Sequence, residues 1–370
     1  MKRLVIRYAA FALLTLGLTF TLAEFAARSL LTHVIRDELS QQNGLLEASP
    51  EFLIEYVNGN RRFVPHAKVT IKNHYLSGED VQIETNSMGL RNEELSPQKP
   101  QDEFRILVLG DSITAADYLP KADTFVSVLE TQLRATHPER TLRVINAGIG
   151  NTGTDEALSL LRAYAEQIKP DLVLLAFYLN DSRPPWGFAG EIGDQGWLRR
   201  HSVLISTAYR LLQEREWVKK TGIDRFAWIE FSKREGWKNS REEFETFLEL
   251  ARFDWGAAWT LDGQEKTAQD LLTLQKLSDM HAFKVALVAF PVLFQLQTKF
   301  DSSSPQAWLQ KEALKLKFDY FDLLPVLKNT KAQELYFDHC HPNRAGNQLI
   351  GNELAKWLEP LIANRSANRS

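Results

Sequence analysis

The stretch that decides the fold is FRILVLGDSI, residues 104–113. Its first part, residues 104–109, is an apolar run rich in branched side chains, which is typical of a buried strand. The segment 124–136 that follows carries apolar residues at helical spacing, and Gly110 lets the backbone turn tightly between the two. Ser112 therefore lies where a strand passes into a helix, the edge at which open α/β sheets bind ligands.

Composition limits the class of protein. A chain of 370 residues with 44% hydrophobic residues is large enough for one α/β domain with insertions or for two domains. The net charge of -3 gives no basic surface of the kind that nucleic acid requires, so we expect no nucleic-acid partner. The single cysteine excludes an internal disulfide framework but does not distinguish the cytoplasm from a periplasm.

The N-terminus indicates export. Residues 1–7 are basic, residues 8–23 carry no charge, and Glu24 ends the uncharged stretch. The apolar segment is shorter than the roughly 20 residues that span a bilayer, but it reaches Ala27 if Glu24 lies near the interface. An uncleaved signal-anchor over residues 1–27 fits best, and a cleaved signal peptide or a buried helix are the alternatives. Either exported form places the rest of the chain in a periplasm or at the cell surface.

The remainder of the chain divides into a short N-terminal part and a main domain. Residues 28–100 are predicted to be a linker followed by a small β-rich preamble, and residues 361–370 form a polar tail. From 101 to 360 apolar runs alternate with helical patterns, which predicts a parallel sheet covered on both faces. The expected strands are 104–109, 141–146, 171–178, 284–290 and, more weakly, 318–322, with helices such as 154–168 and 265–281 between them.

This alternation is interrupted by a helical, charged insertion at about 183–262. It holds seven of the nine tryptophans of the chain. Aromatic faces could form a lid or a substrate wall. We favour the simpler interpretation that these tryptophans pack a helical insertion against the rim of the sheet.

Four short segments bring together chemically active side chains. They are 110–112, 146–154, 178–181 and 338–343, the last lying just before a helix expected at 342–358. Three of them follow predicted strands, and the fourth precedes a helix. Because the carboxyl ends of parallel strands share one edge of the sheet, we expect all four segments to meet there.

The residue types in these segments suit acyl transfer. Ser112 is a candidate nucleophile, although a hydroxyl is weak until a base removes its proton. His341 is the candidate base, because its ordinary pKa lies near neutrality. Asp338, three residues earlier, can accept the other imidazole proton and stabilise the imidazolium.

The reaction also needs donors for a developing oxyanion. Candidates are the backbone N–H of Ser112, a backbone N–H in the turn Gly150–Asn151 and the side-chain amide of Asn180. The neighbouring run 339–341 contains histidine and cysteine, but it lacks further ligands at metal-site spacing. We therefore expect neither a metal nor a cofactor.

The four segments resemble the sequence blocks of the SGNH hydrolases, also called GDSL esterases. Ser112 matches the nucleophile of the Gly-Asp-Ser block, Asn180 the asparagine of the third block, and Asp338 with His341 the Asp-x-x-His block. The resemblance implies a flavodoxin-like α/β/α sandwich. Two positions depart from the pattern: Tyr178 stands where the third block usually opens with glycine, and Asn151 aligns with the oxyanion glycine.

This resemblance implies a serine esterase, and the N-terminal segment predicts that it is exported and membrane-tethered. Its substrate would be a small-molecule, lipid or carbohydrate ester, such as an O-acyl group in the cell envelope. An alternative is an O-acyltransferase that uses the same residues on an envelope polysaccharide. Another alternative is a glycan-binding protein that has lost catalysis. It is less favoured, because such proteins usually lack one of the three catalytic residues and this chain has all three.

Overall fold

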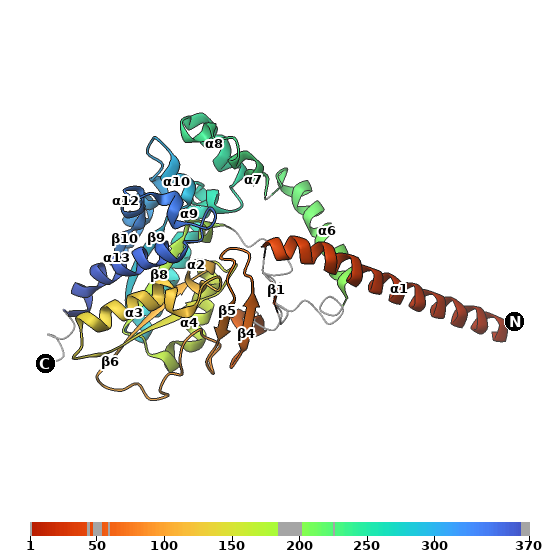
Figure 1. Cartoon of the computed structure of the whole chain (residues 1–370), viewed down its shortest axis with the longest axis horizontal. Helices are drawn as coiled ribbons and strands as arrows, with labels where there is room; N and C mark the ends of the chain where they lie inside the picture. The colour runs from red at the N-terminus through yellow and green to blue at the C-terminus, as the bar shows by residue number, and fades with distance from the viewer. Residues whose placement is uncertain are drawn as a thin grey trace.

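The computed structural model describes residues 2–42, 45–46, 54–57, 60–183, 202–224 and 226–363. Its centre is a five-stranded sheet in the order β10-β9-β8-β6-β7, with every neighbouring pair parallel (Figure 1). This is the flavodoxin-like order, as the resemblance implied. The strands are β6 (Glu103–Gly110), β7 (Thr141–Gly148), β8 (Leu172–Tyr178), β9 (Lys284–Phe290) and β10 (Asp319–Asp322), which confirms the five predicted strands.

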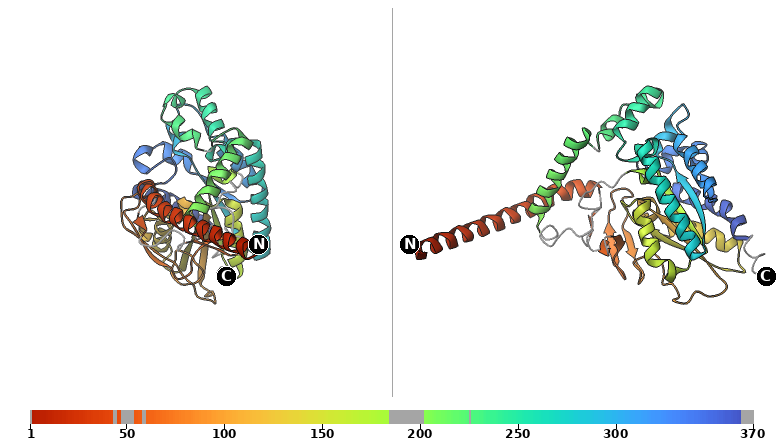
Figure 2. Two further views of the ribbon diagram at one scale, coloured as in Figure 1. Left: turned by 90° about the vertical axis from the view of Figure 1, so that its right-hand side faces the viewer. Right: turned by 180° about the vertical axis from the view of Figure 1, so that it is seen from behind.

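Helices cover both faces of this sheet. Helices α3 (Phe125–Thr136) and α13 (Arg344–Ala363) pack side by side on one face (Figure 1). On the other face lie α4 (Thr154–Ile168) and α9 (Leu261–His281), seen from behind in Figure 2. The predicted three-layer α/β/α sandwich is therefore confirmed. The smaller helices α10 (Leu293–Gln297), α11 (Ser304–Lys315) and α12 (Leu323–Lys328) connect β9, β10 and the last part of the chain.

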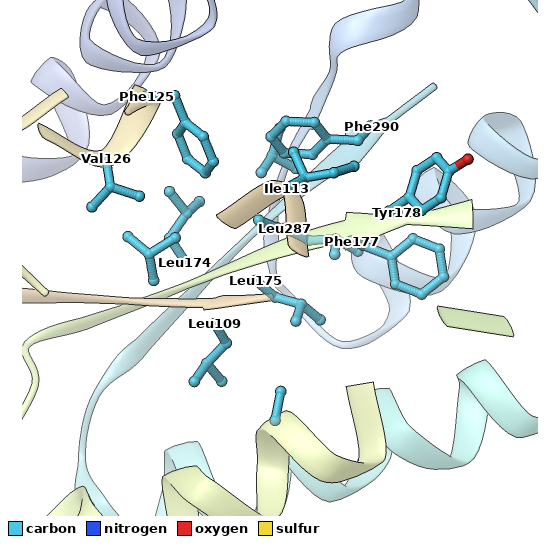
Figure 3. Packing of buried hydrophobic residues seen from close by; sticks show 14 of the residues in the cluster. Leu109, Ile113, Phe125, Val126, Leu174, Leu175, Phe177, Tyr178, Leu287 and Phe290 are labelled. Carbon is cyan, nitrogen blue, oxygen red and sulfur yellow. The ribbon is translucent and has the colours of Figure 1, made fainter. Parts of the chain in front are cut away.

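The core explains why the central strands read as continuous apolar runs. All the residues of β6 and β8 are buried, because each strand has helices above and below it. Figure 3 shows Leu109 and Leu175 on one side of the sheet and Phe125 with Phe290 on the other, the two rings 5.5 Å apart. Each such fully buried side chain contributes about 1.5–3 kcal/mol of apolar transfer free energy.

The preamble packs on the main domain. Strands β1 (Leu45–Leu46), β4 (Lys68–Lys72) and β5 (Val81–Glu84) form an antiparallel sheet, and β2 (Ile54–Val57) pairs with β3 (Asn60–Phe63). Alternate residues of β5 are buried, and Val81 and Ile83 belong to the same apolar core as the central strands. The preamble is therefore an integral part of the core.

The N-terminal segment is a single helix, α1 (Lys2–Gln42), which projects away from the sandwich (Figure 1). It extends beyond the predicted anchor, and its segment Ile6–Ala27 is long and apolar enough to cross a membrane, with a mean hydropathy of 1.7. Hydrogen bonds join this segment to the start of α6 (Val203–Thr221). The Glu24 carboxylate accepts hydrogen bonds from Ser202 Oγ at 2.8 Å and from the Leu204 N–H at 3.1 Å.

The described part of the insertion, residues 202–224 and 226–262, is mainly helical, as predicted. After α6 come α7 (Ala227–Ser232) and α8 (Arg241–Leu250), with short 3-10 segments between and after them. Trp228, Trp237 and Trp255 are at most 5% exposed, and they pack around Phe294 with ring centroids 5.3–6.0 Å from it. These tryptophans form a packed aromatic core, which agrees with the favoured interpretation. Trp186, Trp197 and the rest of residues 184–201 lie outside the described part of the chain.

The start of the last helix differs from the prediction. Helix α13 begins at Arg344, not at Pro342, and continues to Ala363. Pro342 instead forms an isolated antiparallel bridge with Tyr336, and its carbonyl accepts a hydrogen bond from Asn347 Nδ2 at 2.7 Å. The proline therefore closes the preceding loop and does not begin the helix.

Candidate active site

Ser112 stands at a sharp turn after β6. The short helix α2 (Ser112–Ala115) begins at this residue, and Asp111 caps it by accepting the Ile113 N–H at 2.9 Å. A Cβ at Gly110 would lie 2.2 Å from Thr114 Oγ1, so the turn requires glycine at this position. Asp111 thus holds the turn. Its burial raises the pKa of its carboxyl to about 6.

A buried arginine from the preamble braces the end of this short helix. Arg91 is 2% exposed and donates hydrogen bonds to the carbonyls of Ala115, Ala116 and Leu119 at 3.0, 2.7 and 2.6 Å. Ala116 ends α2 in the left-handed region, at φ 43°, so its carbonyl points away from the regular helix direction. Burial lowers the pKa of Arg91 to about 10, which leaves it charged at neutral pH.

Sequence reasoning missed this residue. The acceptors of Arg91 are main-chain carbonyls, which leave no signature in the sequence.

The end of β7 fits closely against α2. Asn146 donates from Nδ2 to the Thr114 carbonyl at 2.7 Å and accepts the Gly148 N–H at 2.9 Å. A Cβ at Gly148 would lie 2.3 Å from the Ala115 nitrogen, which leaves no room for a side chain. The register of β6 and β7 pairs Gly110 with Gly148, so the segments that follow these glycines lie side by side.

Asp338 and His341, the candidate acid and base, share one tight loop. The Asp338 Oδ1 atom accepts the N–H groups of Cys340 and His341, both at 2.8 Å. The loop is closed by the Phe337 N–H, which donates to the His341 carbonyl at 2.9 Å. The Leu293 N–H donates to the His339 carbonyl at 2.8 Å, which fixes the loop to the segment after β9.

Ser112, His341 and Asp338 form a continuous hydrogen-bonded row. Ser112 Oγ lies 2.9 Å from His341 Nε2, and His341 Nδ1 lies 2.8 Å from Asp338 Oδ2. Because the carboxylate can only accept, Nδ1 carries the proton and Nε2 accepts the serine O–H. The structure thus unites two segments that lie 229 residues apart in the sequence. This is the geometry in which a histidine activates a serine hydroxyl.

The electrostatics of the row favour proton transfer. Burial opposes the charge on Asp338, but the facing His341 and its hydrogen bond outweigh burial and hold the carboxyl pKa well below its usual range. Burial likewise disfavours a charged His341, yet the Asp338 carboxylate outweighs it and raises the imidazole pKa. The carboxylate therefore stays ionised at neutral pH and stabilises an imidazolium.

The predicted oxyanion donors lie in the segments after β7 and β8. A Cβ at Gly150 would lie 3.9 Å from the Ser112 Cβ, so Gly150 stands directly beside the candidate nucleophile. Asn151 follows at φ 60°, a left-handed conformation that asparagine tolerates, and its Oδ1 accepts from Arg183 at 3.4 Å. Asn180 lies in the 3-10 segment Leu179–Ser182, and its Oδ1 is buried with no hydrogen-bond partner among the described residues.

The neighbouring Asp181 has a structural contact. Its Oδ2 accepts the Thr154 hydroxyl at 3.0 Å, which joins the segment after β8 to the start of α4. Burial, together with the nearby Asp111, raises the pKa of the Asp181 carboxyl well above its usual range. Asp181 therefore connects the segment after β8 to the start of α4.

Asp338, Cys340 and His341 also lie close enough to consider a metal, with their ligand atoms within 4.8 Å of one another. Both ring nitrogens of His341 are already engaged in the row with Ser112 and Asp338. Cys340 is buried, and burial raises the pKa of its thiol, whereas a metal ligand must be a thiolate. This donor set fits a proton relay better than an ion.

Comparison with known proteins gives likenesses of fold. No family model and no curated protein matches the chain. Among solved structures, a protein called TesA is 17% identical, with a TM-score of 0.41 over 70% of this chain and 99% of its own.

An acetyl xylan esterase, AlAXEase, is 14% identical, with a TM-score of 0.38 over 69% of this chain and 98% of its own. The psychrotrophic esterase EstA from Pseudoalteromonas sp. is 17% identical, with a TM-score of 0.39 over 70% of this chain and 98% of its own.

Proposed function

We propose that this chain is a serine esterase with Ser112 as its nucleophile. The observation that carries the proposal is the row of two short hydrogen bonds, 2.9 Å from Ser112 to His341 and 2.8 Å from His341 to Asp338. A binding protein has no need of a serine, an imidazole and a carboxylate in this order. The lowered pKa of Asp338 keeps its carboxylate charged beside His341, whose pKa it raises, and this supports general base catalysis by the row.

The first half of the reaction forms an acyl-enzyme. Ser112 Oγ attacks the ester carbonyl while His341 Nε2 takes the hydroxyl proton, and Asp338 stabilises the imidazolium. The tetrahedral intermediate then breaks its bond to the alcohol oxygen, which receives the proton from Nε2. In the second half, water attacks the acyl-serine with His341 again as base, and the acid leaves with Ser112 restored.

The carbonyl oxygen gains negative charge in both tetrahedral intermediates. The proposed donors to it are the backbone N–H groups of Ser112 and of Gly150, or alternatively that of Asn151, and the Asn180 side-chain amide. Gly150 is favoured over Asn151 because it stands directly beside Ser112. Loss of one such donor typically raises the barrier by about 3–4 kcal/mol.

The test uses the full chain in detergent with p-nitrophenyl acetate, butyrate and octanoate. We expect Ser112→Ala and His341→Ala to lower kcat by about 10⁴-fold or more, since each removes a member of the row. Ser159→Ala on α4 is the matched control and should keep wild-type turnover. Hydrolysis by Ser112→Ala at the wild-type rate would refute the proposal.

Two further experiments separate the alternatives: product analysis after a glycan is added to the ester, and covalent labelling of the serine. Formation of an acylated glycan in place of free acid would indicate an acyltransferase, with a sugar hydroxyl replacing water in the second half-reaction. A serine-directed fluorophosphonate that labels the wild type, but not Ser112→Ala, would exclude a purely glycan-binding role.

The proposal extends to a membrane-tethered enzyme whose catalytic domain lies outside the cytoplasm. The apolar segment Ile6–Ala27 and its basic N-terminal flank support a signal-anchor. The bonds between Glu24 and residues 202–204 support retention of the helix, since they join it to the insertion. Membrane fractionation and protease treatment of intact spheroplasts test this, and recovery of the chain in the soluble fraction would contradict it.

A further inference from the structure

We propose that Tyr75, carried on residues 74–76 of the preamble, forms the alcohol side of the Ser112 site and binds an uncharged sugar ring. The inference rests on the proposed function, because it assigns the leaving group of that reaction. It adds a substrate class and a binding residue from a part of the chain outside the four sequence blocks.

A row of aromatic rings joins Tyr75 to the catalytic base. The Tyr75 ring stacks on His74 with centroids 4.8 Å apart, and His74 lies 6.3 Å from Tyr118. Tyr118 meets the His341 ring edge-on at 5.2 Å. Tyr118 is 1% exposed whereas Tyr75 is 37% exposed, so the row begins at the surface and ends on the base.

The loop that carries Tyr75 is held in place. The Gly78 N–H donates to the His74 carbonyl at 2.6 Å, and the Leu76 N–H donates to His74 Nδ1 at 3.2 Å. Arg344, three residues after His341, pairs with Glu79 at 2.8 Å and thus ties this loop to the segment that follows the base. A fixed ring loses little entropy when a ligand stacks on it, which is the advantage of a preorganised site.

The position of the row selects the alcohol side of the substrate. In the proposed reaction His341 gives its proton to the departing alcohol, so the alcohol must lie next to the imidazole. The acyl oxygen lies instead toward Gly150 and the oxyanion donors. We therefore assign Tyr75, the exposed end of the row that starts at the His341 ring, to the leaving group.

The charges around Tyr75 select an uncharged ligand. Burial, with the nearby carboxylates of Asp338 and Asp117, raises the pKa of the Tyr75 hydroxyl. The Asp117 carboxylate repels a phosphate or another anionic group, but it accepts hydrogen bonds from hydroxyls. The π face of tyrosine is electronegative and attracts the C–H face of a pyranose. A neutral polyhydroxylated ring satisfies both conditions, whereas an anionic lipid headgroup satisfies neither.

The experiment compares two acetates that differ in their alcohol. kcat/KM is measured on the full chain for acetylated methyl β-xyloside and for ethyl acetate, and the ratio of the two values is the readout. We expect Tyr75→Ala to lower this ratio about tenfold, mainly through KM for the sugar acetate, and Tyr75→Phe to keep it within about twofold. Phe226→Ala, an exposed aromatic residue after α6, is the control and should leave the ratio unchanged. An unchanged ratio in Tyr75→Ala would overturn the proposal.

A binding measurement separates failure of this inference from failure of the proposed esterase. Saturation-transfer NMR follows methyl β-xyloside on the Ser112→Ala protein, which needs no turnover. Binding that is lost in Ser112→Ala/Tyr75→Ala supports the subsite, even if the wild type hydrolyses no ester. Binding that persists in the double variant, or is absent from Ser112→Ala, overturns it whatever the kinetics show.

Discussion

Replacing Arg91 by methionine tests whether the preamble supports the nucleophile turn. The change keeps most of the side-chain volume but removes donors to three carbonyls, at 3.0, 2.7 and 2.6 Å. A hydrogen bond from a charged donor contributes about 1.5–3 kcal/mol, so the gross loss is about 4.5–9 kcal/mol. The variant also no longer buries a guanidinium, which returns several kcal/mol. We expect a net decrease of about 3 kcal/mol in the free energy of unfolding.

The assay is urea unfolding together with the rate at which a fluorophosphonate labels Ser112. Because Arg91 donates to carbonyls at and just after the end of α2, we also expect slower labelling and a lower kcat with little change in KM. Arg91→Lys should recover part of both losses, since the ammonium can reach one or two of these carbonyls. Arg143→Met is the control, because this half-exposed arginine bonds the exposed Glu93. Wild-type stability and labelling in Arg91→Met would refute the reasoning.

Two further predictions concern the acid and the glycines of the site. Asp338→Asn removes the charge that raises the His341 pKa, so the acid limb of the kcat/KM profile against pH should move to lower pH. We expect kcat to fall about 10⁴-fold. An acid limb that stays in place or moves to higher pH would contradict the assigned pair. Gly148→Ala should lower the free energy of unfolding by more than about 3 kcal/mol, because the new Cβ would lie 2.3 Å from a main-chain nitrogen. In Gly150→Ala the nearest atom to the new Cβ is 3.9 Å away, so the melting temperature should change little. Equal melting temperatures for the two variants would show that the close approach at Gly148 is relieved at low cost.

The elements that could be predicted from the sequence are those with strong local signals. The strand 284–290 and the helix 154–168 coincide with β9 and α4, because each has a clear hydrophobic period and clear ends. Ser112 and His341 were expected to meet because both segments lie at the ends of regular elements. Their meeting at 2.9 Å agrees with that argument, while their roles in catalysis stay predictions.

The features that escaped prediction depend on contacts without a local pattern. Arg91 binds backbone carbonyls, and Tyr75 reaches the site through rings contributed by three separate segments. The start of α13 was wrong because proline favours the first helical turn in general, and here a bridge to Tyr336 takes precedence. Such contacts follow from tertiary packing, which a single sequence does not display.

The reactivity of the single cysteine reports the local stability of the loop that carries it. Cys340 lies in the loop between Asp338 and His341, is 6% exposed, and has its sulfur 3.3 Å from His341 Nδ1. An exposed cysteine thiolate attacks a disulfide reagent and displaces its other sulfur as a thiolate, so Cys340 reacts when the loop opens and is protected while the loop is closed. The rate of its modification by a small disulfide therefore reports the opening free energy of the segment that carries Asp338 and His341, in the unaltered protein and without any substrate.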